Sequence, residues 1–389
     1  MKTLPLKRAC HTLMVWGVFF ALAAHAHERG GSGRSPGCVE CGDTITTNTR
    51  LTHDLECSGT EAPALRVVGT GVVLDLGGHT VRRVGSEPGL SEGIAVLANS
   101  TVKNGTIQGF DLGYVLDYDA SHFPDHVWLS KLTFIDNRAA VYNRSGSATF
   151  TISNSYFIAN GSAVGSEQDA SSGKFEVIAS YFLANRLALS ANSHDVEVVR
   201  SNFTFNDMVV WCPYGGVSFT SSRIAFNSVV GRITLGEFGY GFCSQASFVN
   251  TLFLHNDALA PAEWPTWDAF DFVLRDSQVS DNAGGMRVQS RTVDIQGSTL
   301  RRNGGGLSLG HLEEYVPPEL TGTVSGNRFL QNAGDGLRVL VPNSLTVSGN
   351  TAIGNTGWGL HAEGAIDGGG NVAGGNGMGN CAGVVCAPP

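Results

Sequence analysis

Helix-type patterning is missing from this sequence. Outside the first 26 residues, no window shows a sustained apolar stripe at i, i+3, i+4 and i+7. Charged residues are few, at 15%, and Asp and Glu (34) outnumber Lys and Arg (25), so the formal net charge is -9. An acidic chain of this kind is a poor partner for nucleic acid. Disorder is also excluded, because 42% of the residues are hydrophobic, and the 51 glycines suit tight turns instead.

A long apolar run occurs at the N-terminus. Basic residues precede the run LMVWGVFFALAA, and the small-x-small site Ala24-His25-Ala26 follows it. Residues 1–26 are predicted to be a signal peptide rather than a membrane span, because the run is too short. Its removal would leave a secreted or periplasmic protein of net charge -12, since three basic residues leave with it. Residues 27–37 are expected to be a flexible segment.

An asparagine returns at intervals of 21 to 29 residues, each time after a short apolar stretch such as FIDN or FLAN. A period of this size predicts stacked repeats. Asn tolerates a left-handed bend and can hydrogen-bond the Asn of the next repeat, so its predicted role is structural. The repeating asparagines are Asn137, Asn160, Asn185, Asn206, Asn227, Asn256, Asn282, Asn303, Asn332 and Asn355.

Each repeat contains three short stretches of alternating apolar residues separated by turns, which favours β-strands. The sequence therefore predicts an all-β solenoid of about 10–12 coils over residues 67–365, closed by caps at residues 38–66 and 366–389. The phenylalanines that precede the asparagines are expected to stack inside the core. They are Phe134, Phe157, Phe182, Phe203, Phe253 and Phe329.

Three segments carry a family resemblance: CGDTITTNTRLTHDLEC (41–57), GVVLDLGGHTV (71–81) and DGGGNVAGGNGMGNCAGVVC (367–386). They resemble the first and last coils of secreted right-handed parallel β-helix proteins of the pectate-lyase-like superfamily. The resemblance implies that fold over nearly all of the mature chain. It implies less about function, because the superfamily includes lyases, hydrolases, epimerases, copper-site maturation proteins and members without known activity.

Seven cysteines remain after the predicted leader, and pairing is the default in an oxidising compartment. The family resemblance implies a Cys41–Cys57 bridge in the first cap and a Cys381–Cys386 bridge in the last turn. Cys212 and Cys243 fall in neighbouring repeats, which predicts a bridge between coils. Cys38 is then left unpaired, and no second CxxC or histidine cluster completes a zinc site, so no metal site is predicted.

Four repeats carry extra residues after the opening strand, at 118–128, 236–245, 261–271 and 310–320. Stacking would place the last three along one edge, where aromatic rings beside carboxylates suit a sugar chain. The alternative is that Trp264 and Trp267 fold back over the flank of the solenoid. The predicted substrate-binding residues here are Glu237, Trp264, Trp267, Asp268, His311, Glu313, Glu314 and Tyr315, with Tyr240 and Glu263 beside them.

Counting from each asparagine predicts a polar and basic outward row on the opening strands: Tyr142, Ser190, Trp211, Arg232, Thr234, Arg287, Ser308, Arg338 and His361. In this row Tyr142, Trp211 and Arg338 are predicted to bind substrate. The family resemblance implies that such a face holds a polysaccharide and that an arginine can abstract a proton, which makes Arg232 and Arg287 the candidate catalytic residues. A lyase of this type would also use calcium.

Two classes of function remain open on this sequence. The first is a monomeric carbohydrate-binding protein that cleaves or modifies an acidic polysaccharide, as a lyase, epimerase or glycoside hydrolase. The second is a non-catalytic extracellular scaffold or adhesin. Copper-site maturation is less favoured, because only 5 methionines are present and the histidines are dispersed.

Overall fold

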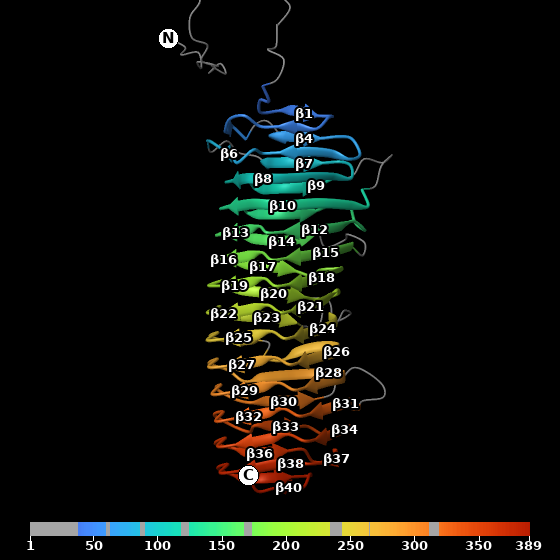
Figure 1. Cartoon of the computed structure of the whole chain (residues 1–389), viewed down its shortest axis with the longest axis vertical. Helices are drawn as coiled ribbons and strands as arrows, with labels where there is room; N and C mark the ends of the chain where they lie inside the picture. Colours follow the sequence, from blue (N-terminus) through green and yellow to red (C-terminus); the bar gives the residue numbers. More distant parts are fainter. Residues whose placement is uncertain are drawn as a thin grey trace, which may run out of the picture. The chain divides into compact units, whose positions relative to one another are not determined.

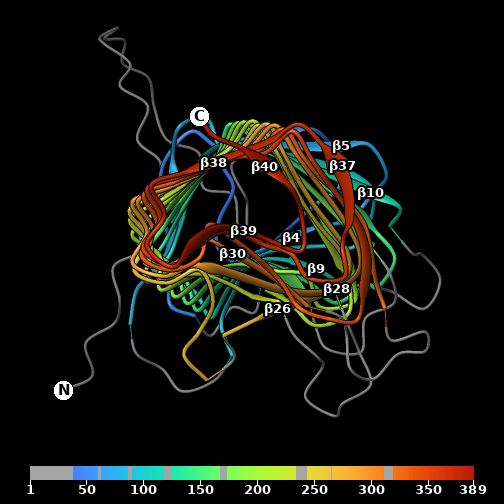
Figure 2. The ribbon, with the colours of Figure 1, turned by 90° about the horizontal axis from the view of Figure 1, so that it is seen from below.

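The computed structural model describes residues 38–59, 63–85, 90–117, 124–166, 173–233, 243–263, 265–310 and 319–389. Residues 41–389 form one compact unit, a parallel β-solenoid of about 13 turns, without a helix in the described ranges. Its strands lie one above another from β1 to β40 (Figure 1), and seen end-on the coils superimpose around a common interior (Figure 2). The all-β solenoid predicted from the repeat is confirmed.

The opening strand of each coil builds the first sheet, in which neighbouring strands pair in parallel, and from β11 onward it follows a corner asparagine. The sheet begins as a nine-stranded run, continues through an isolated bridge between Val229 and Ala258, and resumes at β28. We call it the opening sheet. Its strands are β1 (Asp43–Ile45), β4 (Leu65–Val67), β7 (Glu92–Val96), β9 (Leu112–Leu116), β11 (Ala139–Asn143), β14 (Ser162–Ser166), β17 (Leu187–Ser190), β20 (Met208–Cys212), β23 (Val229–Ile233), the first part of β28 (Met286–Gln296), β30 (Leu307–Gly310), β33 (Leu337–Val339), β36 (Trp358–His361) and β39 (Gly379–Ala382).

The second sheet follows the opening sheet around each coil and is also parallel. Its strands are β2 (Thr49–Arg50), β5 (Val72–Asp75), β8 (Ser100–Gln108), β10 (His126–Ile135), β12 (Thr149–Ser153), β15 (Gly173–Ile178), β18 (His194–Val199), β21 (Gly216–Thr220), β24 (Cys243–Val249), β26 (Trp267–Arg275), β28, β31 (Leu320–Ser325), β34 (Asn343–Ser348) and β37 (Ile366–Gly369).

The third sheet closes each coil, and the long strands β8 and β10 continue into it from the second sheet. Its other strands are β3 (Leu55–Cys57), β6 (Thr80–Arg83), β13 (Tyr156–Ile158), β16 (Tyr181–Leu183), β19 (Asn202–Thr204), β22 (Arg223–Ala225), β25 (Leu252–Leu254), β27 (Gln278–Ser280), β29 (Thr299–Arg301), β32 (Arg328–Leu330), β35 (Thr351–Ile353), β38 (Asn371–Gly374) and β40 (Cys386–Ala387).

Alternation along each strand points one side chain in two into the interior, where residues of successive coils form columns. Phe134, Phe157, Phe182 and Phe203 stack with ring centroids 5.0, 4.6 and 4.5 Å apart, and each is at most 1% exposed. Phe253 and Phe329 are fully buried in the same column, but Ile224, Val279 and Leu300 separate them from other phenylalanines of that column. The predicted core column is therefore present, with continuous ring stacking in its first four members only.

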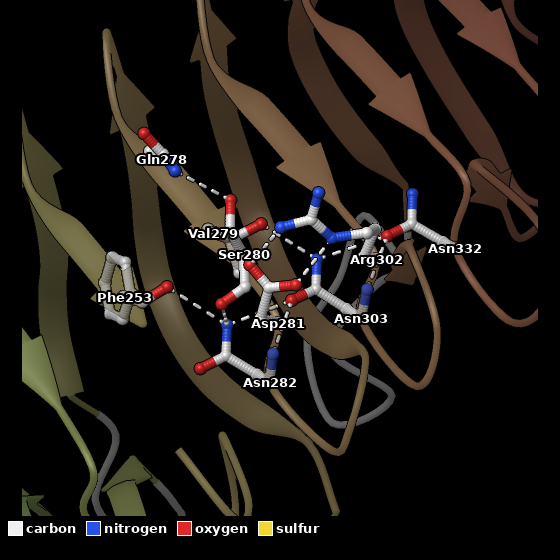
Figure 3. A network of polar contacts seen from close by, with 9 residues as sticks. All are labelled: Phe253, Gln278, Val279, Ser280, Asp281, Asn282, Arg302, Asn303 and Asn332. Carbon is white, nitrogen blue, oxygen red and sulfur yellow. Dashed lines mark hydrogen bonds and ion pairs between the residues drawn. The ribbon is translucent and has the colours of Figure 1, made fainter. Parts of the chain in front are cut away.

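The corner asparagines form a hydrogen-bonded ladder. Asn282 Nδ2 donates to Asn303 Oδ1 at 2.9 Å and to the Phe253 carbonyl at 3.1 Å, and Asn303 Nδ2 donates to Asn332 Oδ1 at 3.2 Å (Figure 3). The same contacts join all ten predicted asparagines, and Asn376 adds an eleventh member. The predicted ladder is confirmed, and its members are at most 3% exposed from Asn137 to Asn355.

The left-handed bend predicted for these asparagines occurs one residue earlier in the chain. The residue before each ladder asparagine has a positive φ: it is near +55° in the non-glycine cases, including Ala184 at 56° and Phe205 at 57°, and 67° at Gly354. The Asn side chain can reach the next coil because its own backbone continues toward the opening strand. The bend is held by the ladder, so residues other than Gly occupy it in all but the last two coils of the ladder, despite a cost of roughly 1–2 kcal/mol each.

A second ladder occupies the corner between the second and third sheets. The backbone N–H of Ser155 donates to Ser180 Oγ at 3.2 Å, and further along the backbone N–H of Asn327 donates to Asn350 Oδ1 at 3.0 Å. The acceptor in this ladder is a side-chain hydroxyl in the early coils and a side-chain amide oxygen in the late ones. Because both corners repeat, successive coils stay in register and outward side chains fall into rows.

All three predicted disulfides are present: Cys41–Cys57, Cys212–Cys243 and Cys381–Cys386. Cys38 is free, also as expected. The solenoid has about 13 turns rather than 10–12. The asparagine count misses coils before Asn137, because Phe110 holds the equivalent corner and donates its N–H to Asn137 Oδ1 at 3.0 Å.

Candidate ligand-binding site

The strand register places the predicted outward residues in two separate rows on the opening sheet. Ser190, Trp211 and Arg232 are neighbours on β17, β20 and β23. Arg287, Ser308, Arg338 and His361 are neighbours on β28, β30, β33 and β36. The coil that contains the Ala258 bridge interrupts the opening sheet between the two rows.

The second row borders a surface depression of about 470 Å³ over β28, β30 and β33. Its position on the outward face of the opening sheet is that predicted for a ligand. The residues that line it are Thr266, Gly285, Met286, Arg287, Val288, Gln289, Gly304, Gly305, Gly306, Leu307, Ser308, Gly310, Ala333, Gly334, Asp335, Arg338 and Leu340.

Glycines form much of this surface because the backbones of adjacent coils approach too closely for side chains. A Cβ atom on Gly304 would lie 1.7 Å from the Ala283 carbonyl oxygen, and one on Gly306 would lie 2.1 Å from the Gly336 carbonyl oxygen. The glycines therefore leave a shelf of bare peptide groups, which a flat ligand can approach closely.

Two cationic side chains flank the shelf. Arg287 and Arg338 are exposed, and neither has a carboxylate within 4 Å in the part of the chain that the structure describes. They sit two coils apart, with Ser308 between them, so their backbones are separated by about 10 Å at the usual 4.8 Å per layer. The depression thus offers two cations at a spacing set by the fold.

The described lining contains a single carboxylate, Asp335. Its Oδ1 accepts a hydrogen bond of 2.7 Å from the backbone N–H of Trp358, which fixes it against the next coil. Calcium prefers six to eight oxygen ligands. The described lining residues do not make such a site, and the described chain holds no group of three or more His, Cys, Asp or Glu placed for a metal.

Asp268 lies beside the depression and is chemically unusual. It is 7% exposed, its Cα partner on the next strand is Gln289, and Thr266, which also lines the depression, hydrogen-bonds its carboxyl. Burial raises the pKa of Asp268 from 3.8 to about 6, against the lowering effect of the Thr266 hydrogen bond. Its Oδ1 has no hydrogen-bond partner within the described segments. Asp268 therefore changes protonation near pH 6.

Trp267 does not serve as a sugar-stacking residue, contrary to one sequence prediction. It is 1% exposed and packs against Phe248 with a centroid distance of 5.4 Å. Its Nε1–H donates to the carbonyls of Leu259 at 2.9 Å and Gly231 at 3.1 Å. The expected loop at 261–271 ends earlier than predicted, because strand β26 begins at Trp267 and alternation turns this ring inward.

Several predicted binding residues lie outside the described residues: Glu237, Trp264, His311, Glu313, Glu314 and Tyr315, together with Tyr240 of the same loops and Thr234 of the outward row. Glu263 is exposed. Tyr142, Trp211 and Arg232 are half-buried and do not line the depression. Tyr142 packs against the small cluster of Leu112, Val115 and Ala139.

Sequence reasoning missed Asp335, Gln289, Thr266 and the glycine shelf. For Asp335 and the glycine shelf, the signal is the glycine-rich stretch directly after a ladder asparagine, as in NGGG at 303–306 and NAGDG at 332–336. Thr266 and Gln289 carry no such signal. Glycine-rich turns that stack in consecutive coils lack side chains, which indicates a depression in the surface.

Comparison with known proteins found no family model, no curated protein and no solved structure that matches this chain. A search of the described residues for an apolar helix of membrane-spanning length found none.

Proposed function

We propose that this protein binds an acidic polysaccharide across the depression on β28, β30 and β33. The observation that carries the proposal is the pair Arg287 and Arg338, exposed cations without a described carboxylate partner beside a glycine shelf in a protein of net charge -9. Guanidinium groups bind carboxylates in two-pronged pairs. A polymer with a carboxylate on its sugars supplies such groups repeatedly along the solenoid axis.

The rest of the depression suits the neutral part of such a polymer. Ser308 and Gln289 offer hydroxyl and amide groups for sugar hydroxyls, and the shelf at Gly304–Gly306 admits a ring without a steric barrier. We assign Arg287 an anion-binding role rather than that of a base. The exposed guanidinium of Arg287 presents N–H donors in the planar geometry that pairs with a carboxylate.

The proposal includes secretion and a place in the pectate-lyase-like superfamily. The parallel solenoid supports the family, and the three disulfides support an oxidising compartment. Chemical modification of the polymer would involve Asp268, because it is the group beside the depression that exchanges a proton near pH 6.

The test is affinity electrophoresis and calorimetry with polygalacturonate and alginate, with a neutral glucan for comparison. The double variant Arg287→Ala/Arg338→Ala should bind the acidic polymers at least ~10-fold more weakly, since two charge-assisted contacts are lost. Arg328→Ala is the matched control, because Arg328 is an exposed arginine on β32 of the third sheet. Absorbance of the unsaturated product would report lyase activity in the same samples. Wild-type protein that binds no acidic polymer, or a double variant that binds as wild type, refutes the proposal.

A non-catalytic surface scaffold is the second candidate, and an exposed aromatic strip on the third sheet favours it. Tyr156 and Tyr181 stack with centroids 5.1 Å apart at 48% and 46% exposure, and Phe205 and Phe226 stack at 5.8 Å along the neighbouring corner. Exposed apolar strips of this kind mark interaction surfaces. Failure of every polymer assay would favour this function.

A further inference from the structure

A tryptophan on the second sheet stands apart from the site above. Trp128 on β10 is 42% exposed, while its strand neighbours Val127 and Leu129 point inward and are fully buried. The Trp128 ring is thus not needed to fill the core beneath this strand. Its exposure calls for another explanation, because a large aromatic side chain gains most when it leaves water.

The Trp128 ring is held in place from one side. It stacks on His126, two residues earlier on the same strand, with centroids 4.2 Å apart and an interplanar angle of 8°. His126 Nε2 lies 2.8 Å from Thr151 Oγ1, and Thr151 donates its hydroxyl proton to Glu176 Oε2 at 3.0 Å. Because Thr151 donates its only hydroxyl proton to Glu176, it must accept in its contact with His126, and His126 Nε2–H is therefore the donor to Thr151 Oγ1.

This chain of contacts ends at an ion pair. Glu176 lies 2.9 Å from Lys174 Nζ, which also contacts Glu197 at 2.7 Å, and the Lys174 contact lowers the pKa of Glu176. Glu176 therefore stays ionised as the acceptor for Thr151. The result is a ring whose orientation is fixed by groups from three successive coils, as a binding platform requires.

Next to the ring lies a shallow cleft of about 510 Å³. It is lined by Trp128, Leu129, Thr101, Ser130, Thr151 and Ser153, so four hydroxyl groups and one aromatic ring surround it and none of the six side chains is charged. The hydroxyls of Thr101, Ser130 and Ser153 can both donate and accept hydrogen bonds, which matches the hydroxyls of a sugar, whereas the Thr151 hydroxyl already bonds His126 and Glu176. The ring offers the apolar surface on which the C–H face of a pyranose packs.

We propose that the Trp128 cleft is a binding site for a neutral sugar unit of a glycan, separate from the acidic-polysaccharide site. A stacked nucleobase of a nucleic acid is disfavoured, because the lining carries no cation for phosphate and the protein has a net charge of -9. The site lies on the second sheet, so it does not depend on Arg287 or Arg338.

The experiment measures retention of the full-length protein in gels that contain a neutral β-glucan, xylan or galactomannan, with tryptophan fluorescence as a second readout. Trp128→Ala should reduce affinity for the retained polymer at least ~10-fold, Trp128→Phe should restore part of it, and His126→Ala should weaken it by loosening the ring. Tyr181→Ala is the control, because Tyr181 is an exposed stacked ring on the third sheet.

Two results would overturn the proposal: no retention of wild-type protein by any neutral polymer, or equal retention of Trp128→Ala and wild type. The double variant Arg287→Ala/Arg338→Ala should keep its neutral-polymer affinity. This outcome separates failure of the neutral-sugar site from failure of the acidic-polysaccharide site.

Discussion

At the scale of single residues, each ladder asparagine from Asn137 to Asn355 uses its side-chain amide to bond both neighbouring coils. Asn227 Oδ1 accepts from both the backbone N–H and the Nδ2 of Asn206, at 2.9 Å each. Its Nδ2 donates to Asn256 Oδ1 and to the Phe203 carbonyl, at 3.0 Å each. A ladder amide thus uses its full capacity within a buried column.

Asn227→Ala should lower the free energy of unfolding by ~3–6 kcal/mol. The backbone N–H and Nδ2 of Asn206 lose their shared acceptor, and the Phe203 and Ala225 carbonyls lose a donor. An unsatisfied buried polar group costs about 1–3 kcal/mol. Urea denaturation followed by circular dichroism measures the loss. Asn202→Ala is the control, since Asn202 is a half-buried outward residue on β19, and it should change stability by less than about 0.5 kcal/mol. Equal effects of the two variants would contradict a structural role for the ladder.

At the scale of elements, the Cys212–Cys243 bridge links β20 to β24 across 31 residues, whereas Cys381–Cys386 spans 5. Replacing both cysteines of the longer bridge by alanine should lower the free energy of unfolding by ~3–4 kcal/mol. The same replacement in the shorter bridge should lower it by ~2 kcal/mol, because a longer closed loop removes more entropy from the unfolded chain. Urea titrations of the two double variants test the order. A larger loss for the shorter bridge would show that the entropic account fails here.

The element scale also shows what sequence alone could predict. The coil repeat, the Asn137–Asn355 column and the Cys212–Cys243 bridge follow from spacing, because each depends on residues at equivalent positions of different coils. The bridges at the two ends were implied by the family resemblance instead. The inward orientation of Trp267 could not be predicted from spacing, since a strand that starts one residue earlier or later turns every side chain to the other face. Asp335 and the glycine shelf escaped prediction because a hollow arises from neighbouring coils together and from no single repeat.

At the scale of the whole molecule, two buried groups give opposite pH dependences. Desolvation lowers the pKa of His194, so its contribution to stability is lost as pH falls below its unfolded value of about 6.5. Asp268 has a folded pKa of about 6, above its ordinary 3.8, so the folded state binds the extra proton. Its contribution is present below pH 3.8 and is lost as pH rises through 6.

Asp268→Asn should therefore stabilise the protein at pH 8 by on the order of 2–3 kcal/mol relative to wild type, and by little at pH 4, because the neutral amide avoids a buried charge. The measurement is urea unfolding of both proteins at the two pH values, and taking the difference removes the His194 effect. A gain of the same size at both pH values would mean that ionisation of Asp268 is not the cause.

The asparagine ladder has a direction as well as a strength. In each of its ten links, Nδ2 of one coil donates to Oδ1 of the next, so every side-chain carbonyl faces the preceding coil. The amide dipoles add head to tail, as peptide dipoles do along a helix. The column is therefore electrically polar, negative toward Phe110 and positive toward Asn376. Although the stack is repetitive, its two ends differ in electrostatic potential, so an anion is favoured at the Asn376 end and a cation at the Phe110 end.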